Sequence, residues 1–553
     1  MGTEITRETF GERDYARFRE RLDQCLSGLG QLLGRPGFGA GPATIGAELE
    51  LFLVDGVARP LPLNQAVRAL AADPRVAVEL NRFDLELNCS PAPLAGRPFT
   101  ALADELGVLL GRVGAAARAH HGRIALIGVL PTLSQAHLSA DAVTSTARYR
   151  ALDRGLRRLR QGPLQIKISG AEPLELTCED IAFEGANCSF QVHLRVAPGD
   201  FTRVYNAVQL ATAPALAVAG NSPTFLGHRL WEETRVALFK QSVEDRDSRG
   251  PKRRPPRTTL GTGWLRDGAL ELFTESVRLH QPLLPFVSAP EAADPEAADP
   301  EAADPEAGFQ VGDPPRLDEL RLHQGTVWRW NRAIYDPAAD GHLRIEMRAL
   351  PAGPTVTDML ANAAFLIGLT LWLAEQDQRW TYGLPFERAD HGFYRAAQYG
   401  LAAELTWPSG PHQVRTVPAA VLVPELLPAA RHGLVRAGVA EAEADHLLGV
   451  IGARVATGQT GAAWQRAALA AAEPGRSREQ ALTVMLDRYL ACAATGQPVH
   501  TWPAPERNLW PVASRARQAP KARQAPVAWS WSSTQVAHRS SSRCSPRTPA
   551  SAC

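Results

Sequence analysis

The stretch GHLRIEMRALPAGPTVTDMLANAAFLIGLTL, at residues 341–371, constrains the fold more than any other. A two-residue period places Arg344, Glu346 and Arg348 on one face of a strand and leaves the opposite face apolar. The PAGP turn ends this strand, and Asp358 is placed to cap the apolar helix that follows. The stretch therefore predicts a strand that packs on its own helix. A solvated strand face would show the same alternation, so the charged face gains meaning only if other strands match it.

Three further segments, at residues 44–56, 83–89 and 189–196, also alternate polar and apolar positions. Their polar faces carry, in chain order, Glu48 with Glu50, Asp84 with Glu86, and Gln191 with His193. Two carboxylates two residues apart lie roughly 7 Å apart along a strand, and they repel each other unless a cation or a donor lies between them. A histidine alone is more often structural than a ligand. The four strands together are harder to explain as solvated faces.

If the four strands share one antiparallel sheet, their polar faces form a concave funnel of carboxylates and one imidazole, with arginines at the rim. Such oxygen-rich sites suit Mg²⁺ or Mn²⁺, usually together with nucleotide phosphates, whereas zinc would require more His or Cys. Arginines beside acids suit recognition of phosphate or carboxylate. The chain has no GxxxxGKS/T motif and no convincing GxGxxG unit, which excludes P-loop and Rossmann nucleotide sites.

Charge and cysteine usage limit the partners. Lys plus Arg number 59 against 58 Asp plus Glu, so the net charge of +1 does not favour nucleic acid or an anionic membrane. The seven cysteines include no CxxC pair, and their odd number suits reduced thiols. The amino terminus lacks the apolar run of a secretory signal, and the longest apolar run, at 363–374, is shorter than the roughly 18–20 residues of a spanning helix. We expect a cytoplasmic protein with small-molecule partners, no membrane partner and no specific nucleic-acid partner.

Composition divides the chain into three parts. Residues 1–40 predict an N-terminal helical segment, and residues 41–503 predict one large domain in which residues 391–500 are helical. Within that domain, residues 288–315 repeat PEAAD and offer too little apolar surface to fold, so they predict a disordered acidic insertion. Residues 504–553 have the composition of a disordered basic tail, with weak polyanion binding as one hypothesis and a passive role as the other.

Three local patterns carry further predictions. The basic residues of a helix at 146–161 predict a solvated face. The basic, Pro-rich segment at 246–263 predicts an exposed connector, with a lid over phosphate as the alternative. The GNSP turn at 220–223 is expected to expose backbone amides and the side chain of Asn221.

Six motifs follow one another along the chain: GAELEL, DLELN, EGANCSFQVHLRV, GNSP, LWEETRVALF and RIEMRALPAGPTVTDMLANAAF. In this order they resemble the family-2 glutamate-cysteine ligases, which are carboxylate-amine ligases related to glutamine synthetase. The similarity covers roughly residues 40–500 without the acidic repeat. Its most discriminating part is RIEMR followed by the Pro turn and the Asn-Ala-Ala-Phe helix.

The resemblance implies an α+β fold, in which an antiparallel sheet funnel like that of glutamine synthetase is backed by helices and followed by a helical C-terminal region. The funnel would bind ATP and Mg²⁺, or Mn²⁺ in its place. By motif position, the metal ligands would be Glu48, Glu50, Glu86, His193 and Glu346. The arginines near phosphate or the developing acyl phosphate, with catalytic roles, would be Arg344 and Arg348. Nucleotide contacts would come from Gln191 and Arg344, and contacts to the amino-acid carboxylate from Asn221 and Arg235. Glu184 matches an acidic position of the family to which no role is assigned.

The implied reaction is attack of a glutamate-like carboxylate on the γ-phosphate of ATP, followed by attack of an amine on the acyl phosphate. Cysteine is the expected amine. The second step needs a base for the ammonium proton, and the sequence offers no obvious candidate. The alternative hypothesis is a catalytically silent protein that binds nucleotide or amino acid on the same fold. The intact acids on all four strands favour the ligase, because a decayed site would be expected to lose some of them.

Overall fold

The computed structural model describes residues 5–246, 254–287, 314–338, 340–376, 378–410 and 412–505. Its central sheet is antiparallel and has the strand order β11-β12-β8-β1-β3-β2, with β4 and β5 paired to β1. These strands are β1 (Thr44–Val54), β2 (Val76–Val78), β3 (Asp84–Asn88), β4 (Ala92–Pro93), β5 (Arg123–Ala125), β8 (Phe190–Val196), β11 (Asn331–Asp336) and β12 (His342–Met347). The four strands predicted from their polar faces are thus β12, β8, β1 and β3, which are consecutive neighbours. The predicted antiparallel sheet is confirmed.

The pleat of the sheet separates an apolar face from a polar one. Leu49 and Leu51 of β1 are fully buried, as is Ile345 of β12. On the other face, the register places Glu50 opposite Glu86 and His193 opposite Glu346. Because residues opposite each other share a face, the polar side chains of the four strands form one continuous row across the sheet.

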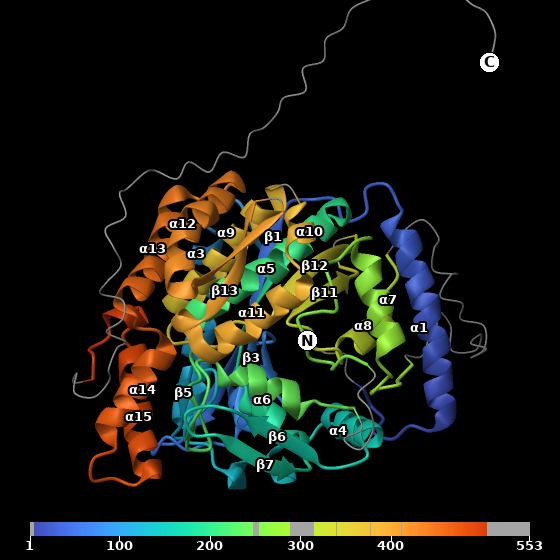
Figure 1. Ribbon diagram of the computed structural model, residues 1–553. Helices are drawn as coiled ribbons and strands as arrows, with labels where there is room; N and C mark the ends of the chain where they lie inside the picture. Colours follow the sequence, from blue (N-terminus) through green and yellow to red (C-terminus); the bar gives the residue numbers. More distant parts are fainter. Residues whose placement is uncertain are drawn as a thin grey trace, which may run out of the picture. The chain divides into compact units, whose positions relative to one another are not determined.

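Long helices lie behind the sheet (Figure 1). Helix α3 (Pro98–Ala119) contacts β1, α5 (Phe201–Ala219) contacts β11, and α9 (Val356–Glu375) contacts β8. By length and composition α9 could cross a membrane, but 78% of its apolar window is buried, as in a core helix. The apolar stretch of residues 341–371 therefore supports the sheet from behind, as predicted.

The predicted cap of α9 is wrong by three residues. Thr355 is the N-cap, and its Oγ1 accepts a hydrogen bond from the backbone N of Asp358 at 3.2 Å. Asp358 lies inside the first turn, where its carboxylate accepts hydrogen bonds from Arg454 Nη2 at 2.8 Å and from the backbone N of Val499 at 3.0 Å. Asp358 is fully buried, and an unpaired buried carboxylate is costly. Its carboxylate therefore pairs with Arg454 instead of capping the helix.

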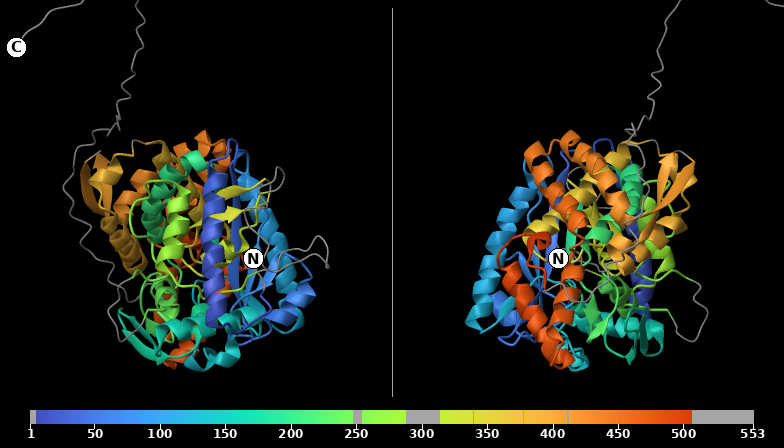
Figure 2. Two further views of the ribbon diagram at one scale, coloured as in Figure 1. Left: turned by 90° about the vertical axis from the view of Figure 1, so that its right-hand side faces the viewer. Right: turned by 60° about the vertical axis from the view of Figure 1, so that its left-hand side comes forward.

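The remaining elements before residue 340 lie outside the central sheet. The N-terminal helix α1 (Glu12–Leu33) packs against α7 (Ala269–Leu279) and α8 (Asp318–Gln324), as Figure 2 shows. The others are α2 (Asn64–Ala71), α4 (Ala147–Arg160), α6 (Thr234–Ser242), and the two hairpins formed by β6 (Leu164–Ile168) with β7 (Leu174–Cys178) and by β9 (Thr224–Phe225) with β10 (His228–Arg229).

The region at 391–500 is not wholly helical. Its helices, with the preceding ones, are α10 (Trp380–Gly383), α11 (Phe386–Tyr399), α12 (Ala419–Arg436), α13 (Glu441–Thr457), α14 (Gly461–Ala472) and α15 (Arg478–Ala493). Between α11 and α12, however, β13 (Glu404–Gly410) and β14 (Gln413–Pro418) form a hairpin. Leu405 and Trp407 are buried there while their neighbours are not, which is the two-residue period of a strand. The helical prediction is wrong for this hairpin.

The predicted exposed connector is wrong where the structure describes it. Arg257 is fully buried, and its Nε donates a hydrogen bond to Asp245 Oδ2 at 2.5 Å. Arg254 Nη1 donates to the same carboxylate at 2.9 Å. Asp245 is itself buried, and it requires these cations because an unpaired buried charge is costly. Residues 247–253 of this segment lie outside the described residues.

The prediction of a solvated face for α4 is also wrong in part. Arg154 and Arg158 are exposed, but Arg160 is buried and donates hydrogen bonds to the backbone oxygens of Gly162 and Glu179. Arg148 is partly buried and faces carboxylates of the sheet, as described below.

Two predictions concern segments that the structure does not describe. The acidic insertion at 288–315 and the basic tail at 504–553 lie outside the described residues, apart from residues 314–315 and 504–505. Both stay predictions.

Candidate active site

The polar face of the sheet holds two groups of three potential metal ligands. The first is the Glu48–His193–Glu346 trio, from β1, β8 and β12, whose ligand atoms lie within 4.8 Å of one another. His193 Nε2 lies 3.2 Å from Glu48 Oε1, and Arg344 Nε donates a hydrogen bond to His193 Nδ1 at 3.1 Å. Arg344 in turn binds Asp336. The imidazole is therefore held from behind by Arg344 with its Nε2 directed at Glu48.

Cations of the protein balance the charge of this first trio. Arg332 of β11 clamps both oxygens of Glu346, with Nε to Oε2 at 2.5 Å and Nη2 to Oε1 at 3.0 Å. Arg348 Nη1 lies 3.4 Å from Glu346 Oε1. Burial would raise the pKa of Glu346, but Arg332, Arg348 and His193 hold it well below its usual value. In the same way, His193 outweighs the burial of Glu48 and lowers its pKa to about 2.

The second group is the Glu50–Glu79–Glu86 trio, whose ligand atoms also lie within 4.8 Å of one another. Glu50 is well held, because its Oε2 accepts hydrogen bonds from Ser189 N at 2.6 Å and Ser189 Oγ at 2.9 Å, and its Oε1 accepts one from Gln191 Nε2 at 3.0 Å. Glu86 accepts a hydrogen bond from Asn88 Nδ2 at 2.8 Å. Three carboxylates thus converge on one point with mainly neutral donors around them.

The pKa values of the second trio are raised above the usual value for glutamate, whereas those of Glu48 and Glu346 are lowered. Burial, and then the charges of Glu86, Glu50 and Glu184, raise the pKa of Glu79 well above its usual value. Burial, and then the charge of Glu48, raise the pKa of Glu86 to about 7. Arg148 of α4 attracts both carboxylates without reversing these shifts. Burial also raises the pKa of Glu50, although Arg348 opposes it. The folded protein therefore holds this trio at a free-energy cost that a bound cation would remove.

The donor atoms of the two trios differ in how well they suit a divalent cation. The second trio offers only carboxylate oxygens, the ligands that Mg²⁺ and Mn²⁺ prefer, and its raised pKa values indicate unbalanced negative charge. The first trio also fits, with one imidazole, but Glu346 would have to share its oxygens between Arg332 and the cation. Neither Glu79 nor Arg332 was singled out from the sequence. Glu79 follows β2 outside any alternating strand, and the pairing of Arg332 depends on the β11–β12 register.

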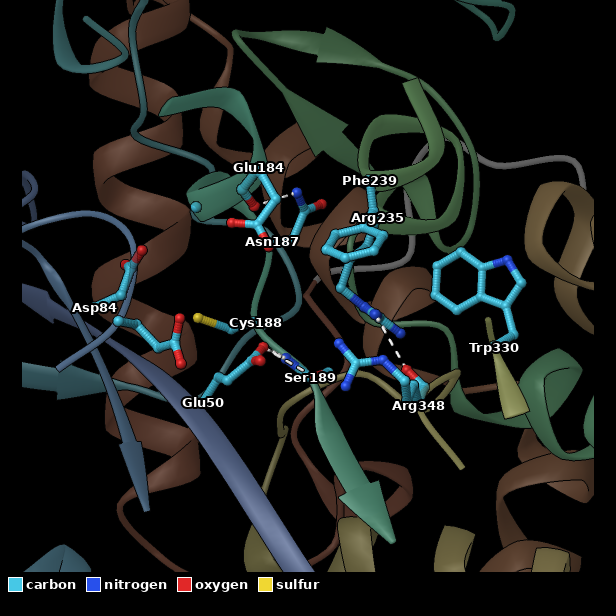
Figure 3. Close-up of a pocket in the computed structure, with 12 residues that line it drawn as sticks. Glu50, Asp84, Glu184, Asn187, Cys188, Ser189, Arg235, Phe239, Trp330 and Arg348 are labelled. Carbon is cyan, nitrogen blue, oxygen red and sulfur yellow. Dashed lines mark hydrogen bonds between the residues drawn. The ribbon is translucent and has the colours of Figure 1, made fainter. Parts of the chain in front are cut away.

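A pocket opens beside the second trio, with an empty volume of about 430 Å³ that includes space open to solvent. Its polar and aromatic lining consists of Glu50, Glu79, Asp84, Glu184, Asn187, Cys188, Ser189, Arg235, Phe239, Trp330 and Arg348. Figure 3 shows Asp84 and Glu50 at one side of the pocket and Trp330 at the other, with Arg235 and Arg348 between them. The pocket therefore has an acidic side and a side that carries two guanidinium groups.

The two arginines of the pocket are fixed by the protein. Arg235 Nε donates to Glu233 Oε1 at 3.0 Å, its Nη2 donates to the backbone oxygen of Ala349, and its guanidinium lies 5.6 Å from the centre of the Trp330 ring. Arg348 donates to Gln191 Oε1. Since Arg348 also faces Glu346, it links the pocket to the first trio.

The structure does not bring Asn221 to the pocket, and the prediction that its side chain is exposed is wrong. Asn221 is fully buried, and its Nδ2 donates to the backbone oxygen of Ala352 at 2.7 Å and to the hydroxyl of Tyr489 at 2.9 Å. Its backbone N donates to Glu233 Oε2 at 2.8 Å. Helices α14 and α15 cover the GNSP turn from outside, which no local pattern of the turn reveals. Asn221 therefore supports Glu233, which holds Arg235.

The other predicted residues do come together. The sheet face carries Glu48, Glu50, Glu86, Gln191, His193, Arg344, Glu346 and Arg348, and Arg235 lies in the adjoining pocket. Their chemical roles are taken up under the proposed function.

Comparison with known proteins bears on this geometry. Residues 44–258, which include β1, β3, β8 and Arg235, match the model of Glutamate-cysteine ligase family 2 (GCS2). These residues therefore have the sequence pattern of that family. The resemblance predicted from the six motifs is confirmed over these residues, and the family is one of ATP-dependent carboxylate-amine ligases.

Two solved structures are similar to the chain. The chain is similar to a glutamate-cysteine ligase of Francisella tularensis in complex with AMP, with a TM-score of 0.50, 12% sequence identity, and coverage of 84% of this chain and 90% of that one. A bifunctional glutathione synthetase of Pasteurella multocida has a TM-score of 0.45, with 12% identity over 87% of this chain and 55% of its own. No curated protein sequence matches the chain significantly. The first of these similarities supports the predicted fold class.

Proposed function

We propose that the chain is an ATP-dependent ligase that joins the carboxylate of glutamate, or of a close analogue, to an amine through an acyl phosphate, with cysteine as the first amine to test. The observation that carries this proposal is the pair of ligand trios on one sheet face, beside a pocket that contains Arg235 and Arg348. A carboxylate and a triphosphate both need cationic partners, and this face concentrates them next to a place for a small molecule.

The arginines have distinct proposed tasks. Arg348 faces both the first trio and the pocket, so it is positioned to neutralise charge on a phosphoryl group as the group moves from ATP to the substrate carboxylate. Arg344 holds His193 and would contact the nucleotide together with Gln191. Arg235, held by Glu233 and stacked near Trp330, suits the carboxylate of the amino acid. Asn221 acts behind Arg235 rather than on the substrate.

Mg²⁺ or Mn²⁺ would be held by the Glu50–Glu79–Glu86 trio and by the Glu48–His193–Glu346 trio. When bound, such an ion supplies charge neutralisation for the phosphates of ATP. The chain itself prepares for it by keeping Glu50 fixed through Ser189 and Gln191, so the carboxylate does not have to reorient. A reducing, cytoplasmic setting agrees with the free thiols of Cys25, Cys89, Cys178, Cys188 and Cys492.

The test is amino-acid-dependent release of ADP from ATP by the purified chain with Mg²⁺. Donor acids, starting with glutamate, are combined with acceptor amines, starting with cysteine, and ADP and the amide product are measured. The expected result is ADP formation that requires the donor and product formation that requires both. ATP binding without ADP release for any pair would favour the silent binding protein, and the ligase proposal would be rejected.

A further inference from the structure

Two buried residues that line the pocket each carry an oxygen atom without a hydrogen-bond donor. Asn187 is 9% exposed, and its Nδ2 donates to the backbone oxygens of Phe183 and Glu184, at 3.2 Å and 2.7 Å. Within the described residues, its Oδ1 has no hydrogen-bond partner. Asp84 is 2% exposed, and its Oδ1 has none among them either. Both residues line the pocket. A buried acceptor without a donor is costly, so Asn187 Oδ1 suits a ligand that brings an N–H group.

Glu184 also lines the pocket, in the 3₁₀ helix η3 (Ile181–Ala186) directly before Asn187. Glu50 is held by Ser189 and Gln191, whereas no side-chain hydrogen bond or ion pair of the Glu184 carboxylate is found among the described residues. The Asn187 amide instead holds the backbone oxygen of Glu184. Figure 3 shows the two side chains next to each other at the edge of the pocket. The segment is thus fixed while the carboxylate stays available.

We propose that Glu184 binds the ammonium group of the acceptor amine, with Asn187 Oδ1 as a second acceptor, and takes the proton that the amine must lose. This inference rests on the proposed ligase function. The pocket lining offers groups of both charges: Arg235 and Arg348 suit carboxylate and phosphate, and the oxygens of Glu184 and Asn187 suit an ammonium group. Burial, and then the charge of Glu50, raise the pKa of Glu184 to about 8, against the attraction of Arg348, which suits proton exchange near neutral pH.

The step balances as follows. The ammonium group R–NH₃⁺ transfers one proton to the Glu184 carboxylate and becomes R–NH₂. Its lone pair then forms the new C–N bond at the acyl carbon, and the C–O bond to phosphate breaks. The electron pair of that bond leaves on phosphate, which also takes the second amine proton and departs as HPO₄²⁻, so the product is the neutral amide. The protonated Glu184 returns its proton to solvent after the product leaves.

The experiment compares cysteine with hydroxylamine as acceptors, with glutamate, ATP and Mg²⁺ present. Hydroxylamine is uncharged near neutral pH and needs no base before it attacks. The proteins are the unchanged chain, Glu184→Gln, and the matched control Glu179→Gln, whose side chain lies five residues earlier and is 76% exposed. We expect Glu184→Gln to lose about 10²-fold or more of amide formation with cysteine, the usual contribution of a general base, and to keep hydroxamate formation within about threefold. Glu179→Gln should retain both activities.

The outcomes separate this inference from the ligase proposal. Equal loss of both activities in Glu184→Gln overturns the inference, because it means that Glu184 serves the fold or the donor substrate. Unchanged amide formation overturns it as well. Retained hydroxamate formation shows that the variant is folded and makes the acyl phosphate. If the unchanged chain forms neither amide nor hydroxamate, the ligase proposal falls and this inference falls with it.

Discussion

The two ligand trios on the sheet face balance their charge in different ways. Glu346 of the first trio is clamped by Arg332, and Glu48 faces His193, so the folded protein favours their ionised forms. The second trio sets Glu79 and Glu86 against other carboxylates, and the folded protein favours their protonated forms. The negative charge of the first trio is therefore balanced by side chains of the protein, whereas the negative charge of the second trio would need a bound cation to balance it. Neutralising one acid should have opposite effects on stability in the two trios.

Glu346→Gln should give the largest effect. It removes a proposed metal ligand and leaves the partly buried Arg332 without its carboxylate, so we expect turnover to fall by about 10³-fold or more and the free energy of unfolding to fall by about 3 kcal/mol. Unfolding should still be cooperative, as chemical denaturation followed by circular dichroism would show. An active variant would refute the assignment of Glu346, and unchanged stability would refute the role of Arg332.

Glu79→Gln should act in the opposite direction on stability. In the presence of EDTA it removes one of the mutually repelling carboxylates, so we expect stabilisation on the order of 1 kcal/mol. The unchanged protein should gain about 2.7 kcal/mol when Mn²⁺ is present at 100 times its dissociation constant, and the variant should gain much less. Thermal unfolding with and without Mn²⁺ measures both, with Glu20→Gln on the exposed face of α1 as the control. If Glu79→Gln proved less stable than the unchanged protein in EDTA, the proposed difference between the two trios would be wrong.

The pH dependence of the metal-free protein should reflect the second trio and Glu184. Their folded-state pKa values, about 7 for Glu86 and about 8 for Glu184, exceed the usual 4.5, so the folded state binds more protons than the unfolded state in this window. The free energy of unfolding should therefore fall by on the order of 1–3 kcal/mol as pH rises from about 5.5 to 8.5. Saturating Mn²⁺ should flatten the slope. A stability that rises with pH in EDTA would contradict this assignment.

Asp336→Asn should give the smallest effect. Asp336 holds Arg344 behind His193, but both partners are about one-quarter exposed, so losing the pair should cost less than about 1 kcal/mol. Activity should change by no more than about fivefold, the kinetic equivalent of that energy. Steady-state kinetics alongside Glu346→Gln would check this. A loss as severe as that of Glu346→Gln would mean that Asp336 and Arg344 matter as much as the metal ligands do.

Strand alternation made much of the sheet face predictable. Glu48, Glu50 and Glu86 stand out because period two separates them from buried leucines, and the same argument reached His193 and Glu346. Glu79 could not be found in this way, since it lies between strands. The hairpin at 404–418 was missed because the surrounding sequence is rich in helix-forming residues.

Burial by distant segments was the other limit. The GNSP turn has the composition of an exposed turn, yet Tyr489 and Gln465, from helices more than two hundred residues later, hydrogen-bond Asn221. Arg257 looks like part of a basic surface loop until Asp245 is placed against it. Local composition indicates whether a segment favours exposure to water. It does not indicate which distant segments of the chain pack against it and bury it.

For residues 341–371, the sequence by itself determined a strand with a charged face and an apolar helix behind it, and the surrounding motifs gave the resemblance to a ligase family. Only the tertiary structure decided how each acid is balanced. Arg332 lies opposite Glu346 in the register of β11 and β12. Glu79 lies outside the strands, yet its ligand atom is within 4.8 Å of that of Glu86. The physical reason is that alternation fixes which face a side chain is on, whereas its pKa and its role depend on the charges that distant segments bring within a few ångströms.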